Sequence, residues 1–208
     1  MHAAMVSRFG GPEVFELTEL PDTGPGPGQV VISVEVADTL FLETVVRSGA
    51  SQDYWPMRPP YVPGNGLAGR VTRVGASVDR GLLGRRVAAH TGGEGGYADR
   101  AIVAAADVSL VPDGLDLTTA AALLHDGATA LALFDATKVS AADTILVVGA
   151  SGGLGLLSLQ LARARAARVV AVARAAKLDR VRQQRPGAVI DSQLRDHDRV
   201  AQRLRHGL

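Results

Sequence analysis

The chain has 208 residues, of which 47% are hydrophobic and 4% aromatic, and its formal net charge is +1. This length and apolar content allow one large domain or two small ones with a hydrophobic core. Cysteine is absent, which excludes a disulfide framework and thiolate metal sites. The sequence contains neither the apolar segment of a signal peptide nor a run of about 18 apolar residues. We therefore expect a cytoplasmic protein without membrane contact.

The charge is unevenly distributed along the chain. Residues 1–162 hold 10 basic and 17 acidic residues, whereas residues 163–208 hold 12 basic and 4 acidic ones. The basic part would attract an anion such as a phosphate-bearing cofactor or nucleic acid, or it could form a solvated arginine-rich helix face. Because the sequence lacks an aromatic stacking platform and a recognised nucleic-acid-binding motif, we do not expect nucleic acid as a partner.

Short strands separated by glycine- and proline-rich turns dominate the first part of the chain. The segment VVISVEVA alternates and is rich in β-branched residues, which is typical of a strand. A helix is expected over residues 39–49, ended by Gly49. This succession predicts a compact barrel over residues 1–115. The expected strands lie in residues 2–9, 14–20, 30–37, 67–75, 83–92 and 95–104.

Near Asp116 the pattern changes to helices and then to alternating strands and helices. Asp116 or Thr118 is a candidate N-cap, and Gly127 is expected to separate two helices. The βαβαβα order that follows predicts a parallel sheet with helical crossovers, within a second domain at residues 116–208. The strands are expected at residues 144–149, 168–173 and 188–191, and the helices at residues 153–165, 177–184 and 193–207.

A glycine cluster joins the first of these strands to its helix. In the pattern G-x-G-x-x-G, alanine takes the first position here, and the strand–turn–helix context is the one that a dinucleotide needs. A glycine lets the backbone approach a pyrophosphate, and amides at the helix N-terminus can bind phosphate oxygens. The alternative is a tight turn without a ligand. The expected cofactor-binding residues are Ala150, Ser151, Gly152, Gly153, Leu154 and Gly155.

The end of the second parallel strand favours NADP(H) over NAD(H). An NAD site needs an acidic residue about 20 residues after the glycines, to bind the ribose 2′-hydroxyl. The chain has Arg174 there, and no carboxylate occurs before Asp179. Arg174 can bind a 2′-phosphate with two hydrogen bonds, and Lys177 can add a positive charge unless it is simply a solvated lysine.

These segments together resemble a known family. The stretches RFGGPEVFEL, PGNGLAGRVTRVG, GGYADRAIV, AAALLHDGATALALF and GASGGLG are similar, in order and spacing, to medium-chain dehydrogenases/reductases. The chain most resembles the zinc-independent, NADPH-dependent quinone oxidoreductase (zeta-crystallin-like) branch. The resemblance implies an α/β protein with an N-terminal β-rich GroES-like barrel and a Rossmann domain. It also implies hydride transfer from NADPH to a quinone or conjugated enone, and we expect a homo-oligomer, a dimer.

The resemblance assigns substrate-site positions and identifies departures from the family. Leu40 stands where zinc-dependent relatives have a catalytic cysteine, and Asn65 stands where they have a histidine, so no metal site is expected. The zinc-free branch usually has asparagine at position 40 and glutamate at position 66, which is Gly66 here. Ser192 replaces a tyrosine that often contacts the adenosine phosphate.

Further candidates come from the same comparison. Thr129 matches a position that faces the nicotinamide, although it could be an ordinary helix threonine. Tyr54 could line the substrate site or donate a proton, or it could be a surface aromatic residue. His90 and His125 are expected to be structural.

The parallel-sheet segment corresponds to one half of a Rossmann domain. We expect a shortened family member whose three-stranded sheet has an open edge, covered by a partner or by further chain. The alternative function is that of a shortened protein without redox turnover, which binds a ligand, acts as a scaffold, or catalyses a non-redox step such as a cyclisation.

Overall fold

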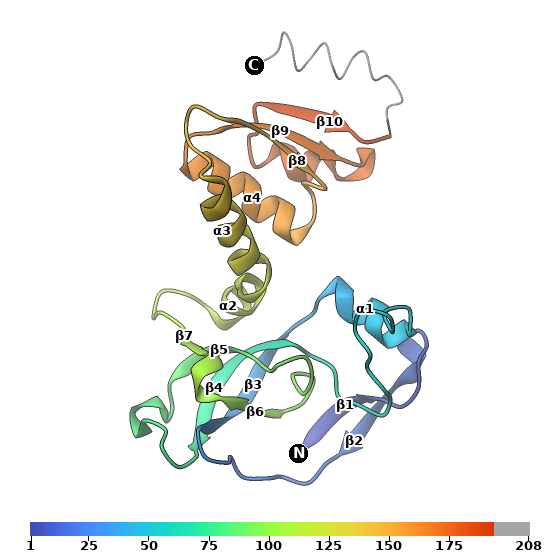
Figure 1. Ribbon diagram of the computed structural model, residues 1–208, viewed down its shortest axis with the longest axis vertical. Helices are drawn as coiled ribbons and strands as arrows, with labels where there is room; N and C mark the ends of the chain where they lie inside the picture. Colours follow the sequence, from blue (N-terminus) through green and yellow to red (C-terminus); the bar gives the residue numbers. More distant parts are fainter. Residues whose placement is uncertain (194–208) are drawn as a thin grey trace. The chain divides into compact units, whose positions relative to one another are not determined.

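The computed structural model describes residues 1–193 of the chain. The chain forms two compact units, Met1–Leu124 and His125–Leu208, called here the barrel unit and the parallel-sheet unit (Figure 1). Sequence patterning puts the domain boundary between residues 115 and 116, whereas the compact units divide after Leu124. The reason is that the helix before Leu124 shares a hydrophobic cluster with strands of the barrel unit.

Seven antiparallel strands form two sheets in the barrel unit. The five-stranded sheet has the order β6-β3-β4-β5-β7, and the two-stranded sheet pairs β1 with β2. Three single-turn helices of the 3-10 type, η1 (Pro12–Val14), η2 (Arg80–Leu82) and η3 (Ala105–Asp107), lie between strands. The strands are β1 (His2–Val6), β2 (Phe15–Glu19), β3 (Gln29–Asp38), β4 (Gly66–Val74), β5 (Arg86–His90), β6 (Arg100–Ala104) and β7 (Val108–Leu110).

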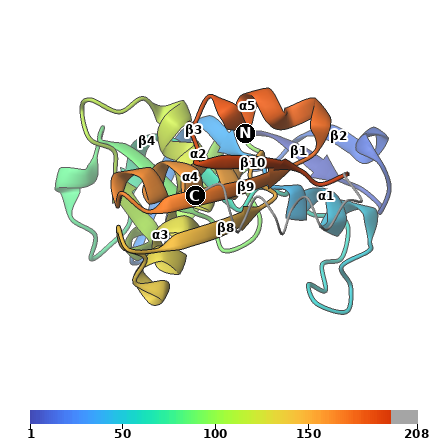
Figure 2. The ribbon, with the colours of Figure 1, turned by 90° about the horizontal axis from the view of Figure 1, so that it is seen from above.

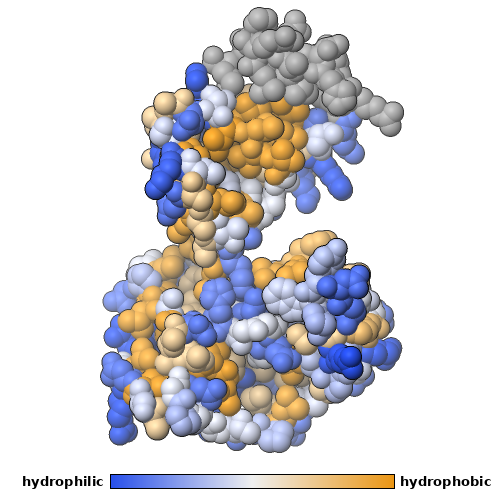
Figure 3. Space-filling view, in the orientation of Figure 1, coloured by the Kyte–Doolittle hydropathy of each residue, from blue (hydrophilic) through white to orange (hydrophobic). Residues whose placement is uncertain are grey.

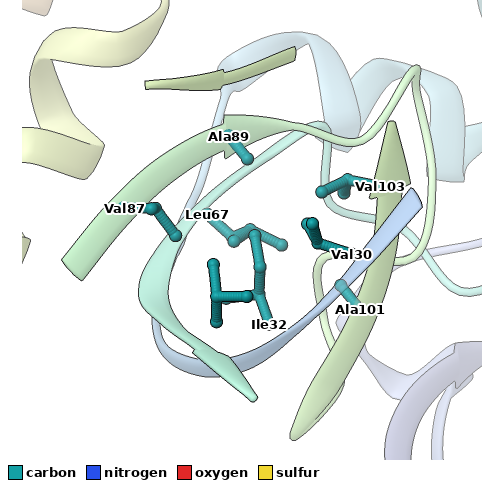
Figure 4. Close-up of a cluster of buried hydrophobic side chains, with 8 residues drawn as sticks. Val30, Ile32, Leu67, Val87, Ala89, Ala101 and Val103 are labelled. Carbon is teal, nitrogen blue, oxygen red and sulfur yellow. The ribbon is translucent and has the colours of Figure 1, made fainter. Parts of the chain in front are cut away.

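Alternation along these strands builds the core of the barrel unit. Val30 and Ile32 are two residues apart on β3, so they point to the same side of the sheet and are fully buried. Figure 4 shows them meeting Leu67, Val87 and Ala101 from neighbouring strands. The pairing of β3 with β4 shifts register twice, and such bulges bend a sheet. The expected β-rich barrel is thus confirmed, with β7 as a strand that the sequence did not predict.

Helix α1 (Phe41–Ser48) follows β3 and ends as the sequence predicts. Gly49 has φ +83°, in the left-handed region that glycine adopts at low cost, and its N–H donates back to the last turn. At the other end, the Glu43 side chain accepts the N–H of Leu40 at 3.0 Å, which caps the helix start.

After β7 the chain forms two helices, α2 (Leu117–Leu124) and α3 (Asp126–Thr137). Asp116 is the N-cap of α2, because its Oδ1 accepts the N–H of Thr119 at 2.8 Å. The expected break at Gly127 is wrong: the helices part at His125, and Gly127 lies inside α3. Glycine lowers helix stability by only about 1 kcal/mol, which the flanking helical residues outweigh.

The parallel-sheet unit has the order β10-β9-β8, with all strands parallel, which confirms the predicted α/β class (Figure 2). Arg165 joins the C-terminal parts of α3 and α4, since it donates to the Phe134 carbonyl at 2.8 Å and pairs with Asp135. The helix expected over residues 193–207 lies outside the described residues. The elements are β8 (Thr144–Val148), α4 (Gly153–Ala164), β9 (Arg168–Ala173), η4 (Ala175–Lys177), α5 (Leu178–Arg182) and β10 (Ala188–Asp191).

Strand β8 forms an open edge of this sheet, as predicted. Within residues 1–193 it pairs with β9 alone. Its side chains Leu146 and Val148 are 57% and 73% exposed, and apolar surface gathers on this unit in Figure 3. The edge therefore presents both unpaired backbone groups and apolar side chains.

No single helix among residues 1–193 is long and apolar enough to cross a membrane. The pair α2 and α3 reaches that length and composition only jointly, and the two helices are interrupted at His125.

Candidate functional site

A tight turn connects β8 to α4. Gly149 has φ +72°, and the N–H of Ala150 donates to the Val172 carbonyl of β9 at 2.9 Å. The Gly152 N–H donates to the Gly149 carbonyl at 2.9 Å, so this amide is used within the turn. The amides of Gly153, Leu154 and Gly155 come before the first helical bond, from Leu156 to Gly152. Gly155 is buried, so the amides of Gly153 and Leu154 are the groups that this helix N-terminus offers to an anion.

The glycines of the turn have different structural roles. A Cβ on Gly155 would lie 2.5 Å from the Gly149 carbonyl oxygen and 2.7 Å from the Ala150 Cα, so only glycine lets α4 pack against the turn. A Cβ on Gly152 would meet nothing closer than 3.4 Å, and this residue is exposed. The backbone is therefore open to close approach at Gly152, as a diphosphate requires. Ser151 and Leu154 are half-buried beside it.

An acidic side chain lies against the start of α4. A Cβ on Gly153 would be 1.9 Å from Oδ2 of Asp126, so the carboxylate of this α3 residue occupies the space beside the glycine. A negative charge is favourable at a helix N-terminus, but it would repel a phosphate bound nearby. Asp126 is not among the candidates from the sequence, because no local pattern indicates this contact between two helices.

Arg174 and Lys177 follow the carboxyl end of β9, the edge where the glycine turn also lies. Val172 bonds to Ala150 in the turn, and Arg174 is two residues further along the chain. Both basic side chains are exposed, and no ion pair or hydrogen bond of the Arg174 side chain is found within residues 1–193. Ser192, which follows β10, donates its N–H to the Ala173 carbonyl at 2.9 Å. The structure thus brings the ends of all three strands together.

Three other residues named from the family resemblance lie on α3, β5 and β4. Thr129 is exposed on α3 and donates its N–H to the His125 carbonyl at 2.9 Å. His90 ends β5, and Gly66 is buried at the start of β4 opposite it.

A second candidate site is a small, mostly apolar cavity inside the barrel unit. It contains Leu40 and Asn65, so the structure brings these two predicted substrate-site residues together. Tyr54 does not line it and is 89% exposed in the loop after α1. The cavity is lined by Leu40, Leu42, Glu43, Val46, Trp55, Met57, Tyr61, Pro63, Asn65 and Gly93.

Glu43 organises the wall of this cavity. Its Oε2 accepts the Leu40 N–H at 3.0 Å and the Tyr97 hydroxyl at 2.6 Å, and its Oε1 accepts the Asn65 N–H at 2.9 Å. Burial, and then the hydrogen bond to Glu43, raise the pKa of Tyr97 to about 12. Glu43 was missed from the sequence, although its place three residues after a helix N-cap is a capping pattern that could have indicated the Leu40 contact.

The polar groups do not form a metal centre in the described part of the chain. Within residues 1–193 no three side chains of histidine, aspartate or glutamate lie close enough together to hold a metal ion.

Comparison with known proteins gives a consistent result. The Alcohol dehydrogenase GroES-like domain family matches residues 26–113. The quinone oxidoreductase of Mus musculus is 37% identical over 177 residues, which cover 83% of this chain and 52% of the relative. That of Pseudomonas aeruginosa is 33% identical over 200 residues, which cover 95% of this chain and 60% of the relative. The chain thus spans about half to three fifths of the length of these curated relatives.

Solved structures share the fold across the chain. The quinone oxidoreductase of Pseudomonas syringae pv. Tomato superposes with a TM-score of 0.88 at 30% identity, covering 99% of this chain and 63% of that chain. A mycobacterial protein solved in complex with NADPH superposes with a TM-score of 0.85 at 31% identity, covering 99% and 62%. Given the antiparallel barrel unit, the parallel sheet and these relatives, the chain belongs to the medium-chain dehydrogenase/reductase superfamily, in its quinone oxidoreductase branch.

Proposed function

We propose that this protein is an oxidoreductase that transfers a hydride from NADPH to a quinone or an α,β-unsaturated carbonyl compound. The observation that carries the proposal is the turn between β8 and α4. Gly155 allows the helix to pack, Gly152 leaves the backbone open, and the amides of Gly153 and Leu154 lie at the start of the helix. The quinone oxidoreductase relatives and the mycobacterial complex with NADPH support the same cofactor class.

The residues of the turn would bind the cofactor phosphates. The amides of Gly153 and Leu154 would donate to the diphosphate, assisted by the positive end of the α4 dipole. Arg174 would pair with the 2′-phosphate of the adenosine ribose, and Lys177 would add charge beside it. Thr129 is proposed to face the nicotinamide. Bound NADPH would supply the hydride, so catalysis by the chain's own residues would consist of positioning and electrostatics.

The barrel unit would bind the substrate through Leu40 and Asn65. For a quinone, addition of one hydride and one proton gives the hydroquinone and NADP⁺, so the reaction needs a proton from solvent or from a nearby hydroxyl. Tyr54 is a candidate proton donor from the sequence. Because its side chain is exposed, its loop would have to move for Tyr54 to reach a bound substrate. We propose that the reaction needs no metal ion.

We also propose that the protein is a cytoplasmic homodimer that does not bind nucleic acid. The open edge of β8, with its exposed Leu146 and Val148, supports association with a second surface. Light scattering after size-exclusion chromatography measures the mass in solution, and a monomer at all concentrations would contradict the dimer.

The test is a calorimetric titration of the purified chain with NADPH and with NADH, followed by a turnover assay with simple quinones and enones. We expect NADPH to bind with a micromolar dissociation constant and NADH to bind at least about tenfold more weakly, because one charged pair is lost. Loss of NADPH absorbance on adding a quinone would exclude the non-redox alternative. Absence of binding for both nucleotides would refute the proposed function.

A further inference from the structure

The hydroxyl of Tyr61 is buried without a hydrogen-bond partner. Among residues 1–193, only two buried side-chain polar atoms lack a partner, namely Tyr61 Oη and Gln52 Nε2. Tyr61 is 6% exposed, and its ring packs with Val6, Val14 and Val46. Native proteins seldom leave a buried hydroxyl unsatisfied, so this group requires an explanation beyond packing.

Tyr61 lines the same cavity as Leu40 and Asn65. The family resemblance did not identify it as a site residue. The cavity has a volume of about 20 Å³. That space holds roughly one water-sized group. An oxygen atom fits into it, whereas a six-membered ring does not. Leu42 and Trp55 also line the cavity and are partly exposed, so the apolar surface continues outward from it.

The carboxylate in the cavity wall already has hydrogen-bond partners. Glu43 accepts hydrogen bonds from Leu40, Asn65 and Tyr97, so three donors share its two oxygen atoms. Burial raises the pKa of the Tyr61 hydroxyl above its ordinary value. The hydroxyl therefore keeps its proton at neutral pH and is a donor without an acceptor among residues 1–193.

We propose that the Tyr61 hydroxyl donates a hydrogen bond to the carbonyl oxygen of a flat, apolar ligand, a quinone or a cyclic enone, whose ring rests against Leu42 and Trp55. The inference rests on the proposed function for the class of ligand. It assigns the carbonyl-binding donor to Tyr61, whereas the sequence pointed to Tyr54. Tyr54 is 89% exposed and lies outside the cavity lining.

The test is an NMR titration of the ¹⁵N-labelled full chain with cyclohex-2-enone, in the absence of NADPH. The chain has no cysteine that could add to the enone. We expect the amide signals of Asn65 and Gly93 to shift, and Tyr61→Phe to weaken enone binding about fivefold, the usual effect of losing one neutral hydrogen bond. Cyclohexene, which lacks the carbonyl, should bind the wild-type chain and Tyr61→Phe equally.

Thermal unfolding provides a second readout that a purely structural tyrosine would change. Tyr61→Phe removes an unsatisfied polar group and should leave the melting temperature equal or raise it. Tyr97→Phe, the matched variant, removes a hydroxyl that is bonded to Glu43 and should lower it.

Three outcomes would overturn the inference: equal enone affinity of the wild-type chain and Tyr61→Phe, no enone binding to the wild-type chain, or a lower melting temperature for Tyr61→Phe. A loss of enone affinity in Tyr54→Phe alone would also overturn it, since the donor would then be Tyr54. Because the titration contains no nucleotide, a chain that selects the enone through Tyr61 but fails to bind NADPH would refute the proposed function and leave this inference standing.

Discussion

Substitution of Gly155 by alanine tests whether close packing of α4 on the glycine turn is essential. In an ordinary helix this change stabilises by about 1 kcal/mol. Here the new Cβ would lie 2.5 Å from the Gly149 carbonyl oxygen, whereas ordinary contact begins at 3.4 Å. The atoms that must move are backbone atoms of the turn, so we take about 3 kcal/mol, the upper end of the usual cost of overpacking. The net expectation is a parallel-sheet unit less stable by about 2 kcal/mol.

Amide hydrogen exchange followed by mass spectrometry measures this effect locally, as the opening free energy of peptides from β8, α4 and β9. Trp55 is the only tryptophan of the chain and belongs to the barrel unit, so its fluorescence during denaturation is an internal control that should not change. Gly152→Ala is the matched variant in the same turn, and without a clash it should cost only about 0.5 kcal/mol at an N-cap. Stronger protection of these peptides in Gly155→Ala would refute the packing argument.

Three further predictions concern charge. Asp126→Asn removes the carboxylate beside Gly153 and should tighten NADPH binding several-fold by calorimetry, with Asp113→Asn in the barrel unit as a charge-matched control that leaves affinity unchanged. Arg174→Ala should weaken NADPH binding at least about tenfold with little effect on NADH, whereas Arg180→Ala should affect neither; equal losses for both nucleotides would contradict the role of Arg174. Tyr97 has a pKa raised from 10.0 to about 12 in the folded state, so its contribution to stability is complete below pH 10 and is lost as the pH rises toward 12. Chemical denaturation across that range should show a smaller decline for Tyr97→Phe.

Most elements of the fold could be predicted because their signals are local. The alternation in β3 and the β-branched composition of β9 each predict a strand from the segment itself, whatever it packs against. Gly49 ends α1 because a left-handed residue is needed there, and Asp116 caps α2 through its own backbone neighbours. The predicted break at Gly127 is wrong because a glycine lowers helix stability without forbidding a helix.

The candidate site was predicted only in part, because much of it is built by contacts distant in sequence. The roles of Gly152 and Gly155 follow from a strand–turn–helix pattern that lies within one short segment. The contact of Asp126 with Gly153 joins two helices, and the hydrogen bond from Tyr97 to Glu43 joins residues 54 positions apart. The buried state of Tyr61 depends on β1 and α1 together, so no window of sequence around it could show an unsatisfied hydroxyl.

The way Glu43 holds the cavity wall bears on how this scaffold could acquire new substrates. The carboxylate accepts hydrogen bonds from the main-chain N–H groups of Leu40 and Asn65. Every residue except proline carries that N–H, so these two hydrogen bonds do not depend on which side chain stands at position 40 or 65. Selection can therefore change the side chains at these two places while both main-chain bonds to Glu43 remain available.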